Sequence, residues 1–296
     1  MVIHALLTQE CHHWREYLAL CKIKVVALIG FTALVGMLLA VQGKPPFLLI
    51  ITALIGICFT AAAAAVLNHV IDRKLDERMI RTARRPLPRQ TLQPYQALIF
   101  ASLLGSIGLM VLAVLINLLT MLLTLAALIG YAGIYTLYLK HMTPQNIVIG
   151  GLAGAAPPVL GWTAMTGYIS AEALLLCLII YTWTPPHFWA LAIYRQRDYA
   201  KANIPMLPVT HGIDFTRLHI LLYTVLLVIV TLLPYLIQMT GMIYLVMVSI
   251  LNIGFIYQSI RLYYDHQAIN AFKTFWFSIY YLMGLFAVLL LDHYLM

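Results

Sequence analysis

Charged residues are scarce in this chain: they make up 9% of its 296 residues, whereas 63% are hydrophobic. A soluble domain usually carries about 25% charged residues, so the composition excludes an ordinary soluble globular protein. The hydrophobic residues form long unbroken runs that do not alternate with polar ones, which is typical of membrane-spanning helices. Because a helix satisfies its own backbone hydrogen bonds in lipid, we predict an all-α integral membrane protein.

Cysteines and leader signals are also scarce. The four cysteines, Cys11, Cys21, Cys58 and Cys177, show no metal-ligand spacing and predict no disulfide framework. The first 16 residues lack an apolar core and a small-residue cleavage site. We therefore expect no signal peptide, and the first apolar run to be a retained helix.

Breaks that carry proline, glycine or charge separate nine candidate spans. We expect a polytopic helical bundle in the lipid bilayer, with residues 1–296 as a single domain and residues 1–16 as a short cytoplasmic segment. The expected spans are residues 23–42, 48–68, 95–116, 118–139, 146–166, 171–192, 216–237, 241–259 and 273–292.

The basic residues fall on one side of this arrangement. Of the 18 Lys and Arg residues, all except Lys44 lie in segments on the same predicted face of the membrane. By the positive-inside rule this face is cytoplasmic, which places the N-terminus in the cytoplasm and the C-terminus outside. The same bias explains the net charge of +8, so we predict no nucleic-acid partner.

The second span runs into an acidic stripe with the spacing N-x-x-x-D-x-x-x-D. Asn68, Asp72 and Asp76 are four residues apart and therefore share one helix face over two turns. The two carboxylates repel each other, and Mg²⁺, which binds carboxylate and phosphate oxygens together, relieves that repulsion. The simpler interpretation is a solvated helix end with ion pairs to Arg73 and Lys74, but polar groups at a membrane boundary usually have a function.

Arginines follow the stripe directly, in the segment 81–88. Arg81 and Arg85 have the planar geometry that binds phosphate bidentately, although a topological signal needs only their charge. Carboxylates that hold a metal beside arginines that hold phosphate indicate a diphosphate-binding site.

A second polar loop follows the sixth predicted span. Pro185 and Pro186 should kink or break the helix there, and His187 follows them among aromatic residues. A single His in an apolar helix is more often a hydrogen-bonded structural residue than a ligand, and the sequence leaves both interpretations open. Asp198 lies about three helical turns further along.

The acidic stripe, the arginine segment, the nine spans and an acidic second loop together resemble the UbiA superfamily of intramembrane prenyltransferases. Within it, residues 143–151, 184–190 and 198–208 resemble the protohaem IX farnesyltransferase (haem o synthase) family. The likeness covers about residues 16 to 292, and the three stretches together are more specific than the acidic motif.

This resemblance implies transfer of a farnesyl group from farnesyl diphosphate to a vinyl group of haem b, giving haem o, in the bacterial plasma (inner) membrane. Aromatic faces would stabilise the allylic cation, and the candidates are Tyr135, Tyr138, Trp183 and Phe188. The resemblance implies that Mg²⁺ is held by Asp72, Asp76, Asn68 and Asp198, and that the three aspartates are catalytic. It implies diphosphate contacts from Asn68, Arg81, Arg85 and Lys201. The implied haem contact is His187, with His69 as the alternative.

The chain departs from the superfamily pattern in two places. Many members carry D-x-x-x-D in the second loop, but the position four after Asp198 is Ala202, as in the haem branch. This puts in doubt how a second Mg²⁺ would be held. The first helix begins Lys22-Ile23-Lys24 where the family has Lys-Pro-Arg, a change of little expected consequence at a helix start.

Two other functions stay open at this point. A prenyltransferase with a quinone-type aromatic acceptor shares the diphosphate site, and the stretch 184–189 with its histidine argues against it. A cation-coupled transporter would use Asp72 and Asp76 as an ion site, but such a protein places acidic residues deep in its spans. Contact with haem a synthase or with an assembling terminal oxidase is left open by the sequence.

Overall fold

The computed structural model describes residues 14–43, 46–79, 81–265 and 267–295, and this part of the chain consists of helices joined by turns and loops, without strands, as predicted. A short helix, Trp14–Leu20, precedes the labelled elements. In chain order these are α2 (Ile23–Leu39), α3 (Phe47–Asp76), α4 (Pro94–Leu115), α5 (Leu118–Leu128), the π-helix η1 (Ile129–Leu139), α6 (Lys140–Met142), α7 (Asn146–Ala155), α8 (Pro157–Thr166), α9 (Ala171–Tyr194), α10 (Gln196–Lys201), α11 (Leu207–Thr210), α12 (Ile213–Leu236), α13 (Met242–Tyr264) and α14 (Ala268–Leu295).

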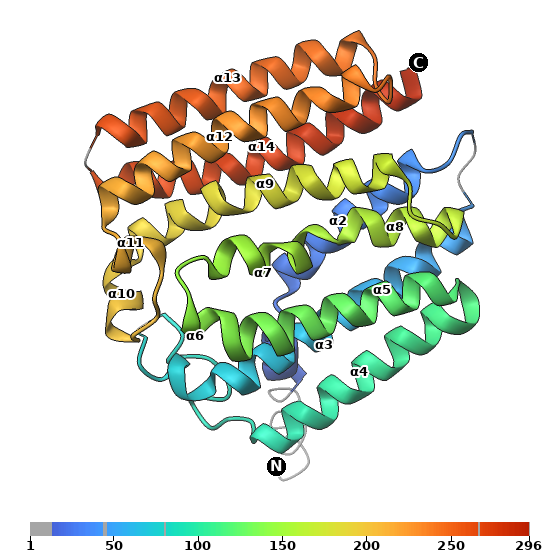
Figure 1. Ribbon diagram of the computed structural model, residues 1–296. Coiled ribbons are helices and arrows are strands. Elements are labelled where there is room, and N and C mark those ends of the chain that lie inside the picture. The colour runs from blue at the N-terminus through green and yellow to red at the C-terminus, as the bar shows by residue number, and fades with distance from the viewer. Residues whose placement is uncertain (1–13, 44–45, 80, 266, 296) are drawn as a thin grey trace, which may run out of the picture.

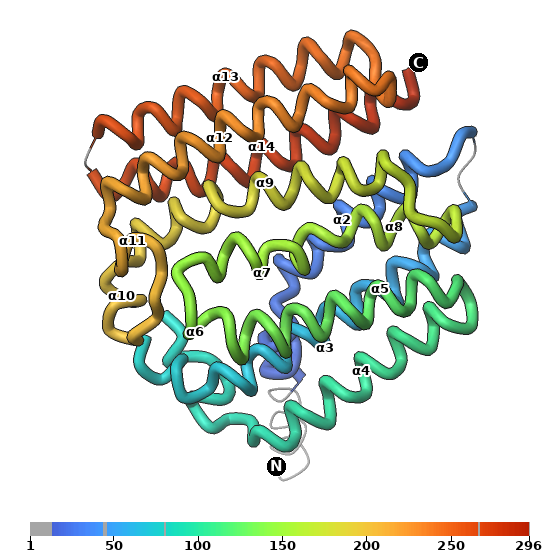
Figure 2. The backbone as a smooth tube through the Cα atoms, viewed as in Figure 1, coloured from blue at the N-terminus to red at the C-terminus, as the bar shows by residue number. Residues whose placement is uncertain are grey.

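The long helices run side by side in one bundle (Figure 1). Helices α12, α13 and α14 pack together along one side, and α3 packs against α4 along the other. Helix α9 borders the first group, and α2 with α7 and α8 fills the space between (Figure 2). The short elements α6, α10 and α11 gather at one end of the bundle, and the C-terminus lies at the opposite end.

The predicted number of spans agrees with the structure. Eight helical segments in the described residues are long and apolar enough to cross a membrane. The count reaches the predicted nine when a bent pair, in which Trp14–Leu20 meets Ile23–Leu39 at 54°, is taken as one span. The second span is longer than predicted, because α3 continues to Asp76 as one helix and so carries the acidic stripe.

Pro185 and Pro186 do not break the sixth span, so the expected break is wrong. Helix α9 continues without interruption from Ala171 to Tyr194. It is the most enclosed span of the described chain, with 72% of its apolar window buried. Surrounding helices can stabilise a proline-containing helix in a membrane by packing against it. Here α14 is joined to α9 by the Trp183 indole, which donates to the Ser278 carbonyl at 2.8 Å.

Two glycines let α2 and α8 cross in direct backbone contact. A Cβ on Gly36 would collide with the Pro158 carbonyl, and a Cβ on Gly161 would collide with the Ala33 carbonyl. Small residues allow this close approach, which is a common way of packing helices in membranes. The crossing fixes the position of α2, whose first residues reach the acidic stripe.

We expect Gly161→Ala to destabilise the protein by about 1–3 kcal/mol, because the added methyl group forces two backbones apart. Gly154→Ala, on the neighbouring helix α7, is the matched control, since a Cβ there meets no atom within 4 Å. Thermal unfolding of both variants in detergent measures the effect. Equal midpoints for the two variants would contradict the close crossing.

Candidate active site

The acidic stripe lies inside the protein. Asn68, Asp72 and Asp76 are 5%, 4% and 2% exposed. Arg73 donates to the Val70 carbonyl at 2.8 Å. The interpretation as a solvated helix end is therefore wrong. Buried carboxylates are costly unless cations or donors compensate them, and the structure supplies both.

Asp72 is paired with a buried lysine. Lys140 Nζ donates to Asp72 Oδ2 at 2.7 Å, and Asn68 Nδ2 donates to the same oxygen at 2.9 Å. Lys140 is itself only 8% exposed. The other carboxylate oxygen, Asp72 Oδ1, is buried and has no hydrogen-bond partner among the described residues.

The π-helix η1 brings Lys140 and Thr136 to the stripe. Thr136 Oγ1 donates to the Tyr131 carbonyl at 2.8 Å and accepts from Asn68 Nδ2 at 3.2 Å. Lys140 follows directly after η1. π-helices are rare and frequently occur at functional sites, because the wider turn changes which side chains share a face.

Asp76 is paired with an arginine from the following loop. Arg85 Nη1 donates to Asp76 Oδ2 at 2.8 Å. The loop is held in position by buried Thr82, whose hydroxyl donates to the Asp76 main-chain carbonyl at 2.9 Å. The predicted proximity of Arg85 to the acidic stripe is therefore observed, while Arg81 is exposed on the same loop.

His69 lies beside Asp76 in the same interior region. Its Nδ1 atom is 4.0 Å from Asp76 Oδ2, and the residue is 3% exposed. Neither ring nitrogen has a hydrogen-bond partner among the described residues. His69 therefore lies next to the acidic stripe. Its predicted contact with haem stays a prediction.

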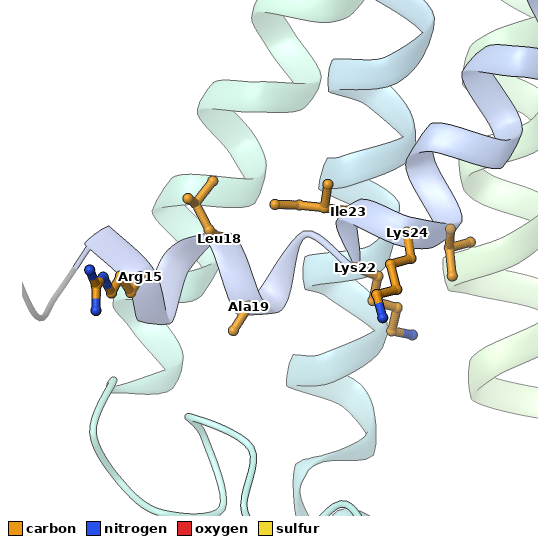
Figure 3. Close-up of a pocket in the computed structure, with 7 residues that line it drawn as sticks. Arg15, Leu18, Ala19, Lys22, Ile23 and Lys24 are labelled. Atoms are coloured by element: carbon orange, nitrogen blue, oxygen red, sulfur yellow. The ribbon is translucent and has the colours of Figure 1, made fainter.

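Lys22 connects the stripe to the bend before α2. Its backbone is left-handed (φ 51°), which is strained for a residue other than glycine and is tolerated mainly at functional sites. Its Nζ donates to Asn68 Oδ1 and lies 3.5 Å from the Tyr131 hydroxyl. Figure 3 shows Lys22 and Lys24 extending from this bend, where they line a cavity of about 360 Å³ together with Arg15.

The second polar loop reaches the first through Tyr199 on α10. Burial raises the pKa of Tyr199, and the positive charges of Arg81 and Arg195 oppose that rise, which places the phenol near both loops. Asp198 instead lies 3.7 Å from Arg195 Nη1 with its side chain 21% exposed. Lys201 is exposed at the end of α10. The metal role of Asp198 and the diphosphate role of Lys201 stay predictions.

His187 is enclosed by aromatic rings. Its Nδ1 is 2.7 Å from Ser278 Oγ, and its ring stacks on Trp183 at 4.2 Å and on Phe275 at 4.6 Å. It is 7% exposed. These contacts support the structural interpretation of His187, and its proposed role as a haem ligand stays a prediction.

The four aromatic candidates for cation stabilisation separate into two groups. Tyr135 stacks on Tyr131 next to the stripe, and Trp183 is buried beside His187. Tyr138 is 61% exposed on η1, and Phe188 is 41% exposed on α9. Tyr138 is therefore wrong as a residue lining an enclosed site.

The donor set at the stripe fits a Mg²⁺ ion that is bound together with a diphosphate. Among the described residues there is no cluster of three His, Cys, Asp or Glu side chains that could hold a metal unaided. Mg²⁺ typically uses one or two protein carboxylates and takes its remaining ligands from phosphate and water. Asp72, with its unbonded buried oxygen, and Asp76 and Asn68 supply that number of ligands.

Sequence reasoning missed several members of this site. Lys22 and Lys140 were interpreted only as topological charges, and Tyr131 and Thr136 were not singled out. Lysines that end an apolar run carry no spacing signal, so only their contact with α3 identifies them. The one indication in the sequence that such a lysine belongs to a functional site was its position at the end of a span with few other charges.

Comparison with known proteins identifies the family. Residues 29–285 match the model of the UbiA prenyltransferase family, and the chain belongs to that family. Within it, the chain is 57% identical over 292 residues to protoheme IX farnesyltransferase 2 of Pseudoalteromonas atlantica, covering 99% of this chain and 96% of the relative. It is 56% identical to protoheme IX farnesyltransferase of Photobacterium profundum, with 97% and 91% covered.

Solved structures share the fold at low sequence identity. A digeranylgeranylglyceryl phosphate synthase superposes with a TM-score of 0.80 at 20% identity, covering 96% of this chain and 99% of that one. A UbiA homolog from Archaeoglobus fulgidus bound to DMAPP and Mg²⁺ superposes with a TM-score of 0.64 at 17% identity, covering 93% and 99%. These similarities confirm the helical architecture.

Proposed function

We propose that this protein transfers the farnesyl group of farnesyl diphosphate to a vinyl group of haem b, giving haem o. The observation that carries the proposal is the set of paired groups at the end of α3, where Asp72 meets Lys140, Asp76 meets Arg85 and Asn68 meets Lys22. Carboxylates and cations so placed hold a metal and a diphosphate together. The relatives more than 50% identical over nearly the whole chain support haem as the acceptor.

The chain's own residues do most of the work in this reaction. Asp72, Asp76 and Asn68 would hold Mg²⁺, and the bound ion would neutralise charge on the diphosphate and so make it a better leaving group. The ammonium groups of Lys22 and Lys140 and the Arg85 guanidinium, now paired with these side chains, are positioned to transfer their hydrogen bonds to diphosphate oxygens. Preorganised cations of this kind stabilise the charge that develops as the C–O bond breaks.

The reaction balances without a covalent enzyme intermediate. The electron pair of the broken C–O bond leaves with diphosphate, and the π electrons of the vinyl group form the new C–C bond. Water then adds to the resulting cation and loses a proton, which gives a hydroxyethylfarnesyl group. The stacked rings of Tyr131 and Tyr135 beside the stripe offer aromatic faces to the allylic cation.

The other two functions account less well for the structure. A quinone-type acceptor would leave the diphosphate site unchanged, but the relatives named above are haem enzymes by their names. Thr82 holds the loop after α3 in a position from which Arg85 reaches Asp76. A transporter does not need this arrangement. An arginine fixed at an acidic pair serves a phosphate ligand better than it serves a transported cation, which it would repel.

Incubation of the purified protein with haem b, farnesyl diphosphate and Mg²⁺, followed by mass analysis, tests the proposal. We expect a product whose mass equals haem b plus one farnesyl group and one hydroxyl group. Chelation of divalent ions should stop its formation, and added Mg²⁺ should restore it. A quinone precursor that is prenylated while haem b is not would overturn the assignment of the acceptor.

We also propose that the end of the bundle carrying the active site faces the cytoplasm and that the C-terminus faces outward, in the bacterial inner membrane. The concentration of Arg and Lys at this end supports the orientation. In a background without the native cysteines, Gln42→Cys should react with an impermeant thiol reagent in intact cells. Lys201→Cys, at the opposite end, should react only after lysis, and the reverse pattern would refute the orientation.

A further inference from the structure

A second polar cavity lies at the end of α9, where α10 begins. Its volume is about 580 Å³, within the range of small-ligand sites. The lining includes Tyr194, Arg195, Arg197, Asp198, Arg217 and Ala268. It therefore presents three guanidinium groups and one carboxylate, and Arg217 also pairs with exposed Asp214 at 2.9 Å. The balance of charge favours an anionic ligand.

Arg195 is positioned to bind that anion. Its guanidinium lies 5.1 Å from the centre of the Tyr194 ring, which fixes the plane of the group. Its nearest carboxylate oxygen, on Asp198, is 3.7 Å away, longer than a good hydrogen bond. The Arg195 Nε atom is buried without a hydrogen-bond partner among the described residues. A guanidinium with unused donors in a cavity matches a carboxylate bidentately.

An aromatic column connects this cavity to the interior of the bundle. Tyr194 stacks on Phe272 at 4.7 Å, Phe272 stacks on Phe275 at 6.3 Å, and Phe275 stacks on His187. His187 precedes Arg195 by eight residues on the same helix, a rise of about 12 Å. A continuous series of stacked rings therefore leads from the cluster of arginines into the bundle.

We propose that the cavity beside Arg195 binds the two propionate carboxylates of haem b, with the macrocycle lying along the aromatic column of α9 and α14. This inference rests on the proposed function. Haem is an amphipathic plate with both carboxylates on one edge, and it matches a site whose cations lie at the end of the bundle and whose aromatic rings lie within the spans. The vinyl groups, away from the carboxylates, then point into the bundle.

Binding titrations of the purified full-length protein, followed by the haem absorption spectrum, test this assignment. The probes are haem b and its dimethyl ester, which lacks both carboxylates. The variants are Arg195→Gln and Arg197→Gln, with Arg261→Gln as the control for loss of a positive charge at the same end of the bundle. Arg261 is exposed at the end of α13 and does not line the cavity.

We expect Arg195→Gln to weaken haem b binding about tenfold or more, the usual effect of losing a charged hydrogen bond. The unmodified protein should bind the dimethyl ester weakly, and Arg195→Gln should bind the ester with the same low affinity. The KM of Arg195→Gln for farnesyl diphosphate should equal that of Arg261→Gln. Arg197→Gln should also weaken haem b binding. Because Arg197 is exposed, this substitution disturbs the fold less than Arg195→Gln does.

Three results would overturn the inference. They are equal affinities of the unmodified protein for haem b and the ester, equal haem affinities of Arg195→Gln and Arg261→Gln, and a raised KM for farnesyl diphosphate in Arg195→Gln without a change in haem affinity. The last would assign the cavity to the diphosphate. Formation of the farnesylated haem by Arg195→Gln at high haem concentration would leave the proposed function standing in each case. No haem binding by the unmodified protein would remove both.

Discussion

Asp72→Asn should reduce turnover by about 10³-fold or more while the protein still inserts in the membrane and folds. The amide keeps the size of the side chain but removes an anionic ligand for Mg²⁺ from the centre of the site. Loss of one preorganised group that stabilises transition-state charge commonly costs about 10²–10³-fold in rate, and Asp72 acts through both metal and lysine. Initial rates of product formation at saturating haem and farnesyl diphosphate measure the effect.

Glu77→Gln is the matched control for this substitution. It also neutralises one carboxylate at the end of α3, but Glu77 is exposed and lies off the face that Asp72 and Asp76 share. Its rate should stay within about twofold of the unmodified protein, in keeping with a surface change. Asp76→Asn should resemble Asp72→Asn. Near-normal turnover in either well-folded variant would refute the metal assignment.

Lys140→Met should lower the free energy of unfolding by about 3 kcal/mol in the absence of substrate. Removing one partner of a buried ion pair leaves the other charge unpaired, and such losses are commonly about 3–5 kcal/mol. Here Asp72 is 4% exposed and keeps only its bond from Asn68, so it has little access to water. Denaturant or thermal unfolding in detergent, followed by circular dichroism, measures the change.

The double variant Asp72→Asn/Lys140→Met separates this effect from simple loss of packing. It replaces both charges at once and should recover most of the lost stability, because no unpaired charge remains. Mg²⁺ added with inorganic pyrophosphate should also stabilise Lys140→Met, since the metal takes the place of the missing cation. Lys201→Met, at an exposed position, should change stability by less than about 0.5 kcal/mol. A double variant as unstable as Lys140→Met would show that the ion pair is not the cause.

Much of the fold was predictable from the sequence because the bilayer limits the alternatives. A membrane span must be helical and apolar, so long apolar runs and the distribution of arginine and lysine define the number of spans. The acidic stripe was predictable for a similar reason. Spacings of four residues place Asn68, Asp72 and Asp76 on one helix face in any helix, whatever its neighbours.

Packing between helices decided the remaining features. The continuity of α9 through Pro185 and Pro186 depends on the helices that enclose it, which no local preference reveals. The π-helix and the left-handed backbone at Lys22 are likewise conformations that isolated segments avoid.

The sequence by itself determined a helical membrane protein with two carboxylates and an amide on one helix face, because hydrophobicity and helical periodicity act locally along the chain. Only the tertiary structure decided that this stripe is buried and which cations meet it. Lys22, Lys140 and Arg85 come from three different segments, and their charges look alike in the sequence. Their selection depends on distance in space, since an ion pair forms only where folding brings the two groups within a few ångströms of each other.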